Sequence, residues 1–225
     1  SEAASLSDVK AYARKNRLAI GSLYVCMALV SLAAYAQGFW DIAFLSRSYD
    51  RDPSSVTFMY GMVQLFAGLS GMLTGGIVAD RLSKRGIQGA SVIMVLIGCA
   101  ISTPFSFLYP LMGTASSALL LMVFAIFGSN MAFACAASAM QRMFPVAMLG
   151  LAAGVYYFLS NSVGLLIGPT LIASLTDYVF EDPGKVGYSL SAVGGTARLL
   201  AFIIILAGYK AYRDLLQARE AGLES

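Results

Sequence analysis

Two charged residues lie inside apolar stretches that are long enough to cross a membrane, where they can do chemistry that their neighbours cannot. Arg198 lies well inside the last such stretch, and Asp41 lies toward the end of the first. A guanidinium stays protonated and suits a carboxylate or phosphate partner, whereas a carboxylate can take up and release a proton. The pair therefore predicts contact with an anionic head group, an arginine–carboxylate contact or proton coupling. A static ion pair, an arginine that extends toward the interface and a hydrated interfacial carboxylate are the structural alternatives.

Further polar residues lie at mid-span depth and complete the set of candidate substrate and coupling residues. They are Gln37, Gln64, Asn130, Tyr157 and Asn161. Such side chains line cavities in membrane proteins, but they also hold helices together by hydrogen bonds. The sequence leaves both roles open for each of them.

The composition argues against an enzyme. Histidine is absent, which excludes Ser-His and Cys-His catalysis and histidine metal sites. Cys26, Cys99 and Cys135 lie in apolar runs and are odd in number, so we expect small buried side chains rather than a disulfide or a metal site. No glycine-rich phosphate-binding motif follows a strand. We therefore expect no catalytic residues, no cofactor, no metal and no nucleic-acid partner.

An all-α membrane protein is the fold class that composition indicates. Hydrophobic residues make up 58% of the chain and charged residues 12%, against about 25% charged in soluble domains. Six apolar stretches approach the spanning length of about 20 residues. We place them at 18–46, 56–79, 88–109, 116–141, 147–176 and 188–210.

The predicted organisation has three parts around these spans. Ser5-Leu-Ser-Asp8 has capping-box spacing and begins an amphipathic stretch that suits the membrane surface. The parts are a cytoplasmic linker helix at 1–17, a six-helix bundle at 18–210 and a cytoplasmic tail at 211–225.

The distribution of basic residues predicts the orientation. Eleven of the fifteen Lys and Arg residues flank the spans on one side: Lys10, Arg14, Lys15, Arg17, Arg81, Lys84, Arg85, Arg142, Lys210, Arg213 and Arg219. On the opposite side are only Arg47, Arg51 and Lys185. Because basic loops stay in the cytoplasm, we expect both termini there.

A shift of 97 residues reveals an internal repeat. It aligns the second and fifth spans in the order aromatic hydroxyl, amide, glycine and aspartate. The matched residues are Tyr60, Gln64, Gly71 and Asp80 with Tyr157, Asn161, Gly168 and Asp177. Three crossings separate the two spans, so the related segments run in opposite directions. The sequence thus predicts a 3+3 inverted repeat, which is a signature of secondary transporters.

The segment from Gly76 to Arg85, which reads GIVADRLSKR, resembles the loop motif between the second and third helices of each half of a major facilitator superfamily transporter. Ser83 replaces a motif glycine, as expected in the weaker second copy. The resemblance implies that the chain is the C-terminal six-helix half, with an N-terminal half as its partner. It also implies alternating access.

A finer resemblance is to bacterial spinster-like members of that superfamily. It rests on Gly168-Pro169-Thr170, Thr176-Asp177-Tyr178 and the segment 186–190. It implies proton coupling, a small amphiphilic cargo of the lysolipid or sphingosine-phosphate type, and a location in the bacterial inner membrane. The proton carrier can equally lie in the other half.

Two further roles are predicted for residues away from the cargo. Residues at the cytoplasmic end of the second span are expected to form a conformational latch: Gly76, Asp80, Arg81, Lys84 and Arg85. Residues that interrupt the fifth helix are expected to form a hinge, with a plain helix bend as the alternative: Gly164, Gly168 and Pro169. A membrane scaffold, a channel subunit and a complete homodimeric transporter stay as alternative functions of the whole chain.

Overall fold

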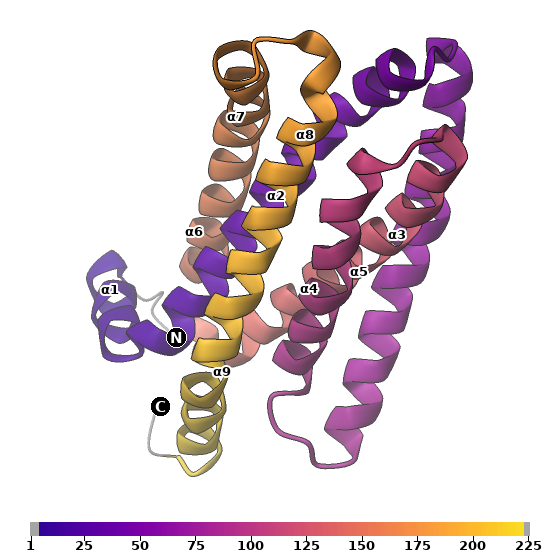
Figure 1. Ribbon diagram of the computed structural model, residues 1–225. Helices are drawn as coiled ribbons and strands as arrows, with labels where there is room; N and C mark the ends of the chain where they lie inside the picture. The colour runs from indigo at the N-terminus through magenta and orange to yellow at the C-terminus, as the bar shows by residue number, and fades with distance from the viewer. Residues whose placement is uncertain (1–4, 223–225) are drawn as a thin grey trace.

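The computed structural model describes residues 5–222, and within them the regular structure is entirely helical. Six helical segments are long and apolar enough to cross a membrane, which confirms the predicted fold class (Figure 1). The first four are α2 (Arg17–Tyr49), α3 (Pro53–Lys84), α4 (Ala90–Leu108) with η1 (Tyr109–Leu111), and α5 (Ala115–Met143).

The fifth and sixth spans are each built from several helical pieces. The fifth runs through η2 (Val146–Met148), α6 (Leu149–Ser162), η3 (Val163–Ile167), α7 (Gly168–Ser174) and η4 (Leu175–Val179). The sixth runs through η5 (Pro183–Lys185), α8 (Val186–Leu190), η6 (Ser191–Gly195) and α9 (Thr196–Glu220). The segments η3, η4 and η6 are π-helical, a geometry that often marks functional positions in long helices.

The predicted boundaries differ from the structure mainly at the end of the chain. Helix α9 continues from position 210 to Glu220, so the segment predicted as a tail is helical up to that residue. Residues 1–4 of the predicted linker and 223–225 of the predicted tail lie outside the described residues. Helix α1 (Leu6–Lys15) has the predicted capping box, in which Ser5 and Asp8 cap each other's backbone N–H groups.

The first and fourth spans have equivalent packing environments, because each packs mainly against two other spans. Helix α2 packs against the fifth span and α9, whereas α5 packs against α3 and α4. Gly71 of α3 lies against the backbone carbonyl of Phe127, and Gly168 lies against that of Leu32 on α2. A two-fold exchange of the halves produces such a pattern, although the inverted repeat itself stays a prediction.

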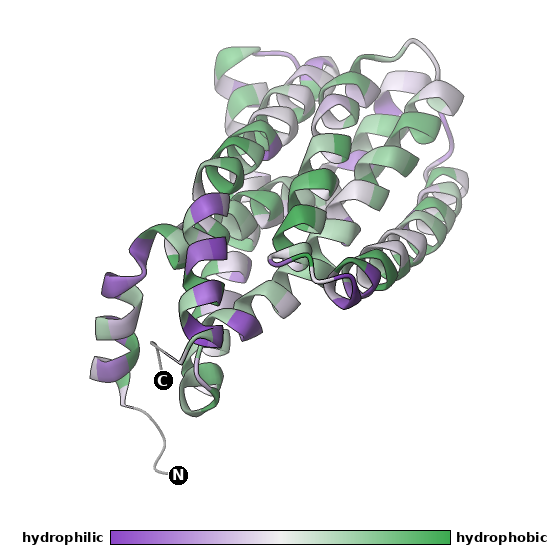
Figure 2. Ribbon diagram, turned by 90° about the horizontal axis from the view of Figure 1, so that it is seen from below, coloured by the Kyte–Doolittle hydropathy of each residue, from purple (hydrophilic) through white to green (hydrophobic). Residues whose placement is uncertain are grey.

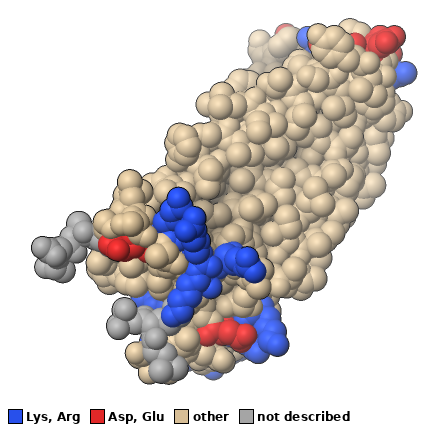
Figure 3. All heavy atoms as spheres, turned by 90° about the vertical axis from the view of Figure 1, so that its left-hand side faces the viewer, with Lys and Arg blue, Asp and Glu red and all other residues tan. Residues whose placement is uncertain are grey.

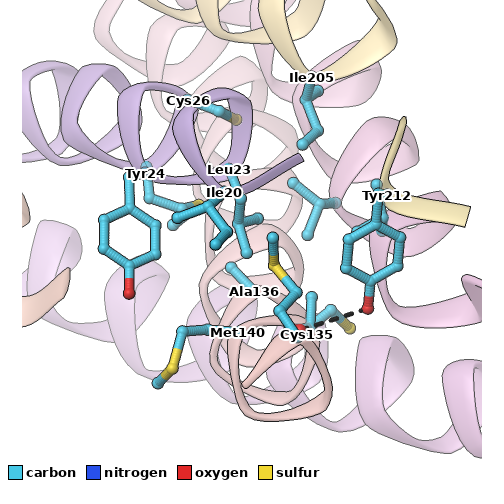
Figure 4. Packing of buried hydrophobic residues seen from close by; sticks show 14 of the residues in the cluster. Ile20, Leu23, Tyr24, Cys26, Cys135, Ala136, Met140, Ile205 and Tyr212 are labelled. Atoms are coloured by element: carbon cyan, nitrogen blue, oxygen red, sulfur yellow. Dashed lines mark hydrogen bonds between the residues drawn. The ribbon is translucent and has the colours of Figure 1, made fainter. Parts of the chain in front are cut away.

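The apolar core has two clusters, and buried polar residues lie between them on several of the spans. The cluster in Figure 4 contains Leu23, Met140 and Ile205, and Tyr212 donates a hydrogen bond to the Ala139 carbonyl at 3.3 Å beside it. The other contains residues of the same helices farther along. The residues at the division are less than 5% exposed: Ser31, Ser102, Ser106, Ser129 and Arg198. A polar layer thus crosses the middle of the bundle.

Charged side chains gather at the two ends of the molecule. Hydrophobic residues follow the spans, and hydrophilic residues follow α1 and the helix ends (Figure 2). Lys and Arg side chains cluster over the end that carries α1, and the face between the ends is uncharged (Figure 3). Helix α1, the turn after α3 and the end of α9 lie at this same end (Figure 1).

Candidate functional site

Arg198 is the centre of a buried polar network that joins three helices. It is 3% exposed, and its Nη1 donates to the Gln37 Oε1 atom at 2.5 Å. Its Nε donates to the Ser129 Oγ atom at 3.0 Å. Desolvating a guanidinium costs several kcal/mol, roughly, unless hydrogen bonds compensate. Helices α2 and α5 supply these compensating acceptors to α9.

Asp41 lies close enough to Arg198 for an electrostatic interaction, but no hydrogen bond among the described residues joins it to the Arg198 group, and it is held by tyrosines instead. The Tyr109 hydroxyl donates to the Asp41 Oδ1 atom at 2.6 Å, and the Tyr60 hydroxyl lies close to the same carboxylate. The exposed Gln64 reaches this second group through Tyr60, since its Nε2 donates to the Tyr60 hydroxyl at 2.7 Å. Among these described side chains, Arg198 bonds to neutral acceptors and makes no direct ion pair with Asp41.

Gln37 is the residue through which α2 contacts Arg198. It lies one helical turn before Asp41, so both side chains lie on one side of α2, where Gln37 meets Arg198 of α9 and Asp41 meets Tyr109 of η1. Its Oε1 atom accepts from Arg198, whereas its buried Nε2 has no hydrogen-bond partner among the described residues. A Cβ atom on Gly194 would collide with that Nε2. The π-helical turn η6, which contains Gly194, therefore leaves the space that the amide needs.

A separate cavity of about 540 Å³ is bounded by α2, α3, α5 and α6. Its wall includes Tyr157 and Asn161, and the Tyr35 hydroxyl donates to the Asn161 Oδ1 atom at 2.6 Å. The Ser160 Oγ atom is buried and has no partner among the described residues. Most of the remaining wall is apolar, including Met72 and Phe133. An amphiphile with one polar group matches this lining.

The structure divides the predicted site residues into groups. Gln37 and Arg198 are hydrogen-bonded to each other, and Asp41 lies in a neighbouring buried group with Tyr109 and Tyr60, at whose edge Gln64 lies. Tyr157 and Asn161 line the cavity. Asn130 joins none of these groups, because its Nδ2 donates to the Ile126 carbonyl at 2.9 Å and its side chain lies over Gly68.

The residues predicted to form a hinge pack closely against α2. Gly164 lies in η3, where a Cβ atom would collide with the Tyr35 ring. Gly168 faces the Leu32 carbonyl, and the Pro169 carbonyl accepts from the Trp40 indole at 3.1 Å. Close packing thus accounts for both glycines. Their role as a hinge stays a prediction.

The residues predicted to form a latch lie at the exposed end of α3. Asp80, Arg81, Lys84 and Arg85 are exposed, and within residues 5–222 their side chains make no hydrogen bond or ion pair. Gly76 is half-buried, with open space around its Cβ position. The segment does contact another span through Ser83, whose Oγ accepts from Arg142 Nη1 at 3.2 Å. The latch stays a prediction.

Sequence reasoning missed three members of the two buried polar groups. Tyr109 lies at the predicted end of a span, where a tyrosine normally faces the interface. Ser129 could not be singled out from the sequence, because small residues are common in membrane helices. Tyr60 appears in the predicted repeat, and its four-residue spacing to Gln64 is the signal that identifies it as a site residue.

Comparisons with known proteins point to one family. The Major Facilitator Superfamily profile matches residues 2–179. A bacterial homolog of the human lysosomal transporter Spinster has a similar fold in its inward-facing, occupied conformation, with a TM-score of 0.65 at 13% identity, over 88% of this chain and 49% of that one. Its inward-facing, unoccupied conformation gives a TM-score of 0.64 at 12% identity, over 95% and 50%. The chain spans about half the length of these structures. No match was found among curated proteins.

Proposed function

The chain belongs to the Major Facilitator Superfamily, and from this membership we propose that it forms one six-helix half of a secondary active transporter that works by alternating access. An N-terminal six-helix half of the same transporter is its partner. The length of the chain supports this proposal, since it covers half of each similar solved structure.

The observation that carries proton coupling is the buried carboxylate of Asp41 near the Arg198–Gln37 pair. A carboxylate and a guanidinium both lie within the bundle, 3% exposed each, and interact electrostatically without a direct ion pair, because the guanidinium bonds to Gln37 and Ser129. Protonation of Asp41 removes the negative charge that attracts Arg198. In our proposal this frees Arg198 to exchange Gln37 for an anionic group of the cargo, and release of the proton reverses the exchange.

The cargo proposed is a small amphiphile of the lysolipid type. The support is the cavity beside α2, which has an apolar wall and a few polar groups at Tyr35, Ser160 and Asn161. The cavity and the polar groups at Arg198 and Asp41 both include residues of α2. Movement of α2 therefore provides the mechanical link between cargo binding and the state of Asp41.

We place the transporter in the bacterial inner membrane with both termini in the cytoplasm. The support is the concentration of Lys and Arg at the end that carries α1 (Figure 3). This orientation puts the loop of Asp80 and Arg81 at the cytoplasmic face, where the proposed latch acts on the inward and outward states.

Flux measurements test the coupling. The transporter, with its other half present, is reconstituted in liposomes that contain a pH-sensitive dye, and lysophosphatidylglycerol is added. We expect cargo flux that depends on the pH gradient. Asp41→Asn should allow flux without proton movement, and Arg198→Ala should abolish flux of this anionic cargo.

The controls use exposed residues of the same types. Asp50→Asn matches the first variant, because Asp50 ends α2 in the left-handed conformation that asparagine also tolerates. Arg47→Ala matches the second, and both controls should behave as the unchanged protein. Flux that ignores the pH gradient would overturn the coupling. Retained coupling in Asp41→Asn would assign the proton to the other half.

A further inference from the structure

A second hollow lies at the basic end of the molecule, one helical turn beyond the proposed cargo cavity along α5. This groove of about 570 Å³ is formed by the end of α5, the connection to α6 and the end of α9. Its lining combines polar and apolar side chains. They include Gln141, Arg142, Arg219, Phe144, Val146 and Leu149.

The two arginines of the groove are positioned without being neutralised. Arg219 Nη1 donates to the Arg142 carbonyl at 2.5 Å, and Arg142 Nη1 donates to Ser83 Oγ at 3.2 Å. The buried Arg219 Nε has no partner, and neither guanidinium pairs with a carboxylate among residues 5–222. The one carboxylate of the lining, Glu220, accepts from Gln88 at 2.7 Å. The lining of the groove therefore carries two positive charges and one negative charge.

Contacts with α1 place this groove at the level of the membrane surface. The Tyr12 hydroxyl donates to the Met143 carbonyl at 2.8 Å, and the rings of Tyr12 and Phe144 lie 5.6 Å apart. Helix α1 is amphipathic, and its exposed Leu6 suits the apolar side of an interface. Val146, at the rim of the groove, is 85% exposed. An apolar side chain so exposed at this level is suited to acyl chains.

We propose that the groove binds an anionic phospholipid of the membrane, with the lipid phosphate on Arg142 and Arg219 and the glycerol and acyl carbons against Val146 and Leu149. Arginine forks match phosphate oxygens, and an orphan Nε–H supplies a donor that is already desolvated. A free phosphate would use the arginines alone and would leave Val146 exposed. The bound lipid ties the α5–α6 connection to the end of α9.

Lipid titration followed by native mass spectrometry tests the site. The transporter, purified in detergent micelles with its other half present, is titrated with palmitoyl-oleoyl-phosphatidylglycerol and, separately, with the phosphatidylcholine of the same chains. We expect preferential binding of phosphatidylglycerol. Each of Arg142→Gln and Arg219→Gln should weaken it about fivefold, which corresponds to about 1 kcal/mol per basic residue at a membrane surface. The double variant should weaken it further, by up to about 25-fold, because two arginines that share one phosphate need not act additively.

Three further variants make the result specific. Arg47→Gln with Arg51→Gln removes two exposed arginines from the opposite end and should leave binding unchanged. Val146→Asp alters an exposed side chain without touching the core, so it should fold and still lose phosphatidylglycerol. Deleting residues 223–225 should change nothing.

Several outcomes would overturn the proposal. Equal losses in the Arg142/Arg219 and Arg47/Arg51 pairs would show non-specific charge attraction. Displacement by millimolar inorganic phosphate, with full binding in Val146→Asp, would assign the site to free phosphate. Binding that appears only after residues 223–225 are deleted would assign the groove to the chain's own tail. None of these results bears on the flux of lysophosphatidylglycerol, so the proposed transport stands or falls separately.

Discussion

The buried amide of Gln37 holds the guanidinium of Arg198 in the resting network. Replacing it by leucine keeps the volume but leaves Arg198 Nη1 without its acceptor. Hydrogen bonds to charged groups contribute about 1.5–3 kcal/mol, so we expect Gln37→Leu to lower the free energy of unfolding by that amount. Unfolding in mixed micelles with increasing dodecyl sulfate measures it. The exposed Gln141→Leu is the control, and equal stability of the two variants would show that Arg198 does not need the amide.

At the surface, the capping box of α1 predicts a pH dependence. The hydrogen bonds from the Ser5 hydroxyl and backbone N–H hold the pKa of Asp8 below its ordinary value of 3.8. Because the folded helix favours the ionised carboxylate, the cap stabilises α1 above pH 3.8, and this stabilisation is lost as pH falls through the lowered pKa. NMR titration of Asp8 in micelles should show its pKa rise toward 3.8 in Ser5→Ala. An unchanged pKa in Ser5→Ala, or an equal rise in Ser7→Ala, would contradict this account.

Among the helices, Gly71 determines how closely α3 and α5 approach. A Cβ atom there would collide with the Phe127 carbonyl, whereas one on Gly61 of the same helix has nothing within 4 Å. Overpacking costs about 1–3 kcal/mol, so Gly71→Ala should destabilise the protein by that amount. Gly61→Ala should be neutral or should stabilise by up to about 1 kcal/mol. Unfolding of both variants in mixed micelles compares them, and a stable Gly71→Ala protein would show that the helices separate at little cost.

The elements were predictable because lipid imposes a simple rule on sequence. Apolar runs must be helical and long enough to cross, so all six spans could be located. Their ends were less predictable, since a helix such as α9 can continue past the lipid on polar residues up to Glu220. The π-helical turns could not be predicted from local sequence. One of them, η3, lies where Gly164 packs against Tyr35 of another helix.

The site was predictable only within single helices. Gln37 and Asp41 are one turn apart, so their common face could be read from spacing. That Arg198 meets Gln37 rather than Asp41 depends on the register between α2 and α9, which no local pattern encodes. Tyr109 depends on the register of α4 in the same way.

For the whole molecule, exposure of apolar surface is uneven in a way that suits a two-half transporter. The apolar windows of α3 and of Val146–Val179 are 28% and 22% buried, whereas those of the other four spans are 44% to 56% buried. The second and fifth spans are also the pair that the predicted repeat relates. We therefore expect the other half to pack against these two spans.

The concentration of basic residues at one end of the molecule also predicts its orientation in the membrane. Cys26, Cys99 and Cys135 are buried, so a single cysteine added at an exposed position is the one that reacts. If the basic end faces the cytoplasm, Ser54→Cys at the opposite end should react with a membrane-impermeant maleimide in intact cells. Lys10→Cys on α1 should react only after the membrane is permeabilised, because the eleven basic residues at its end resist translocation. Labelling of Lys10→Cys in intact cells would reverse the orientation and move the arginine groove to the outer leaflet.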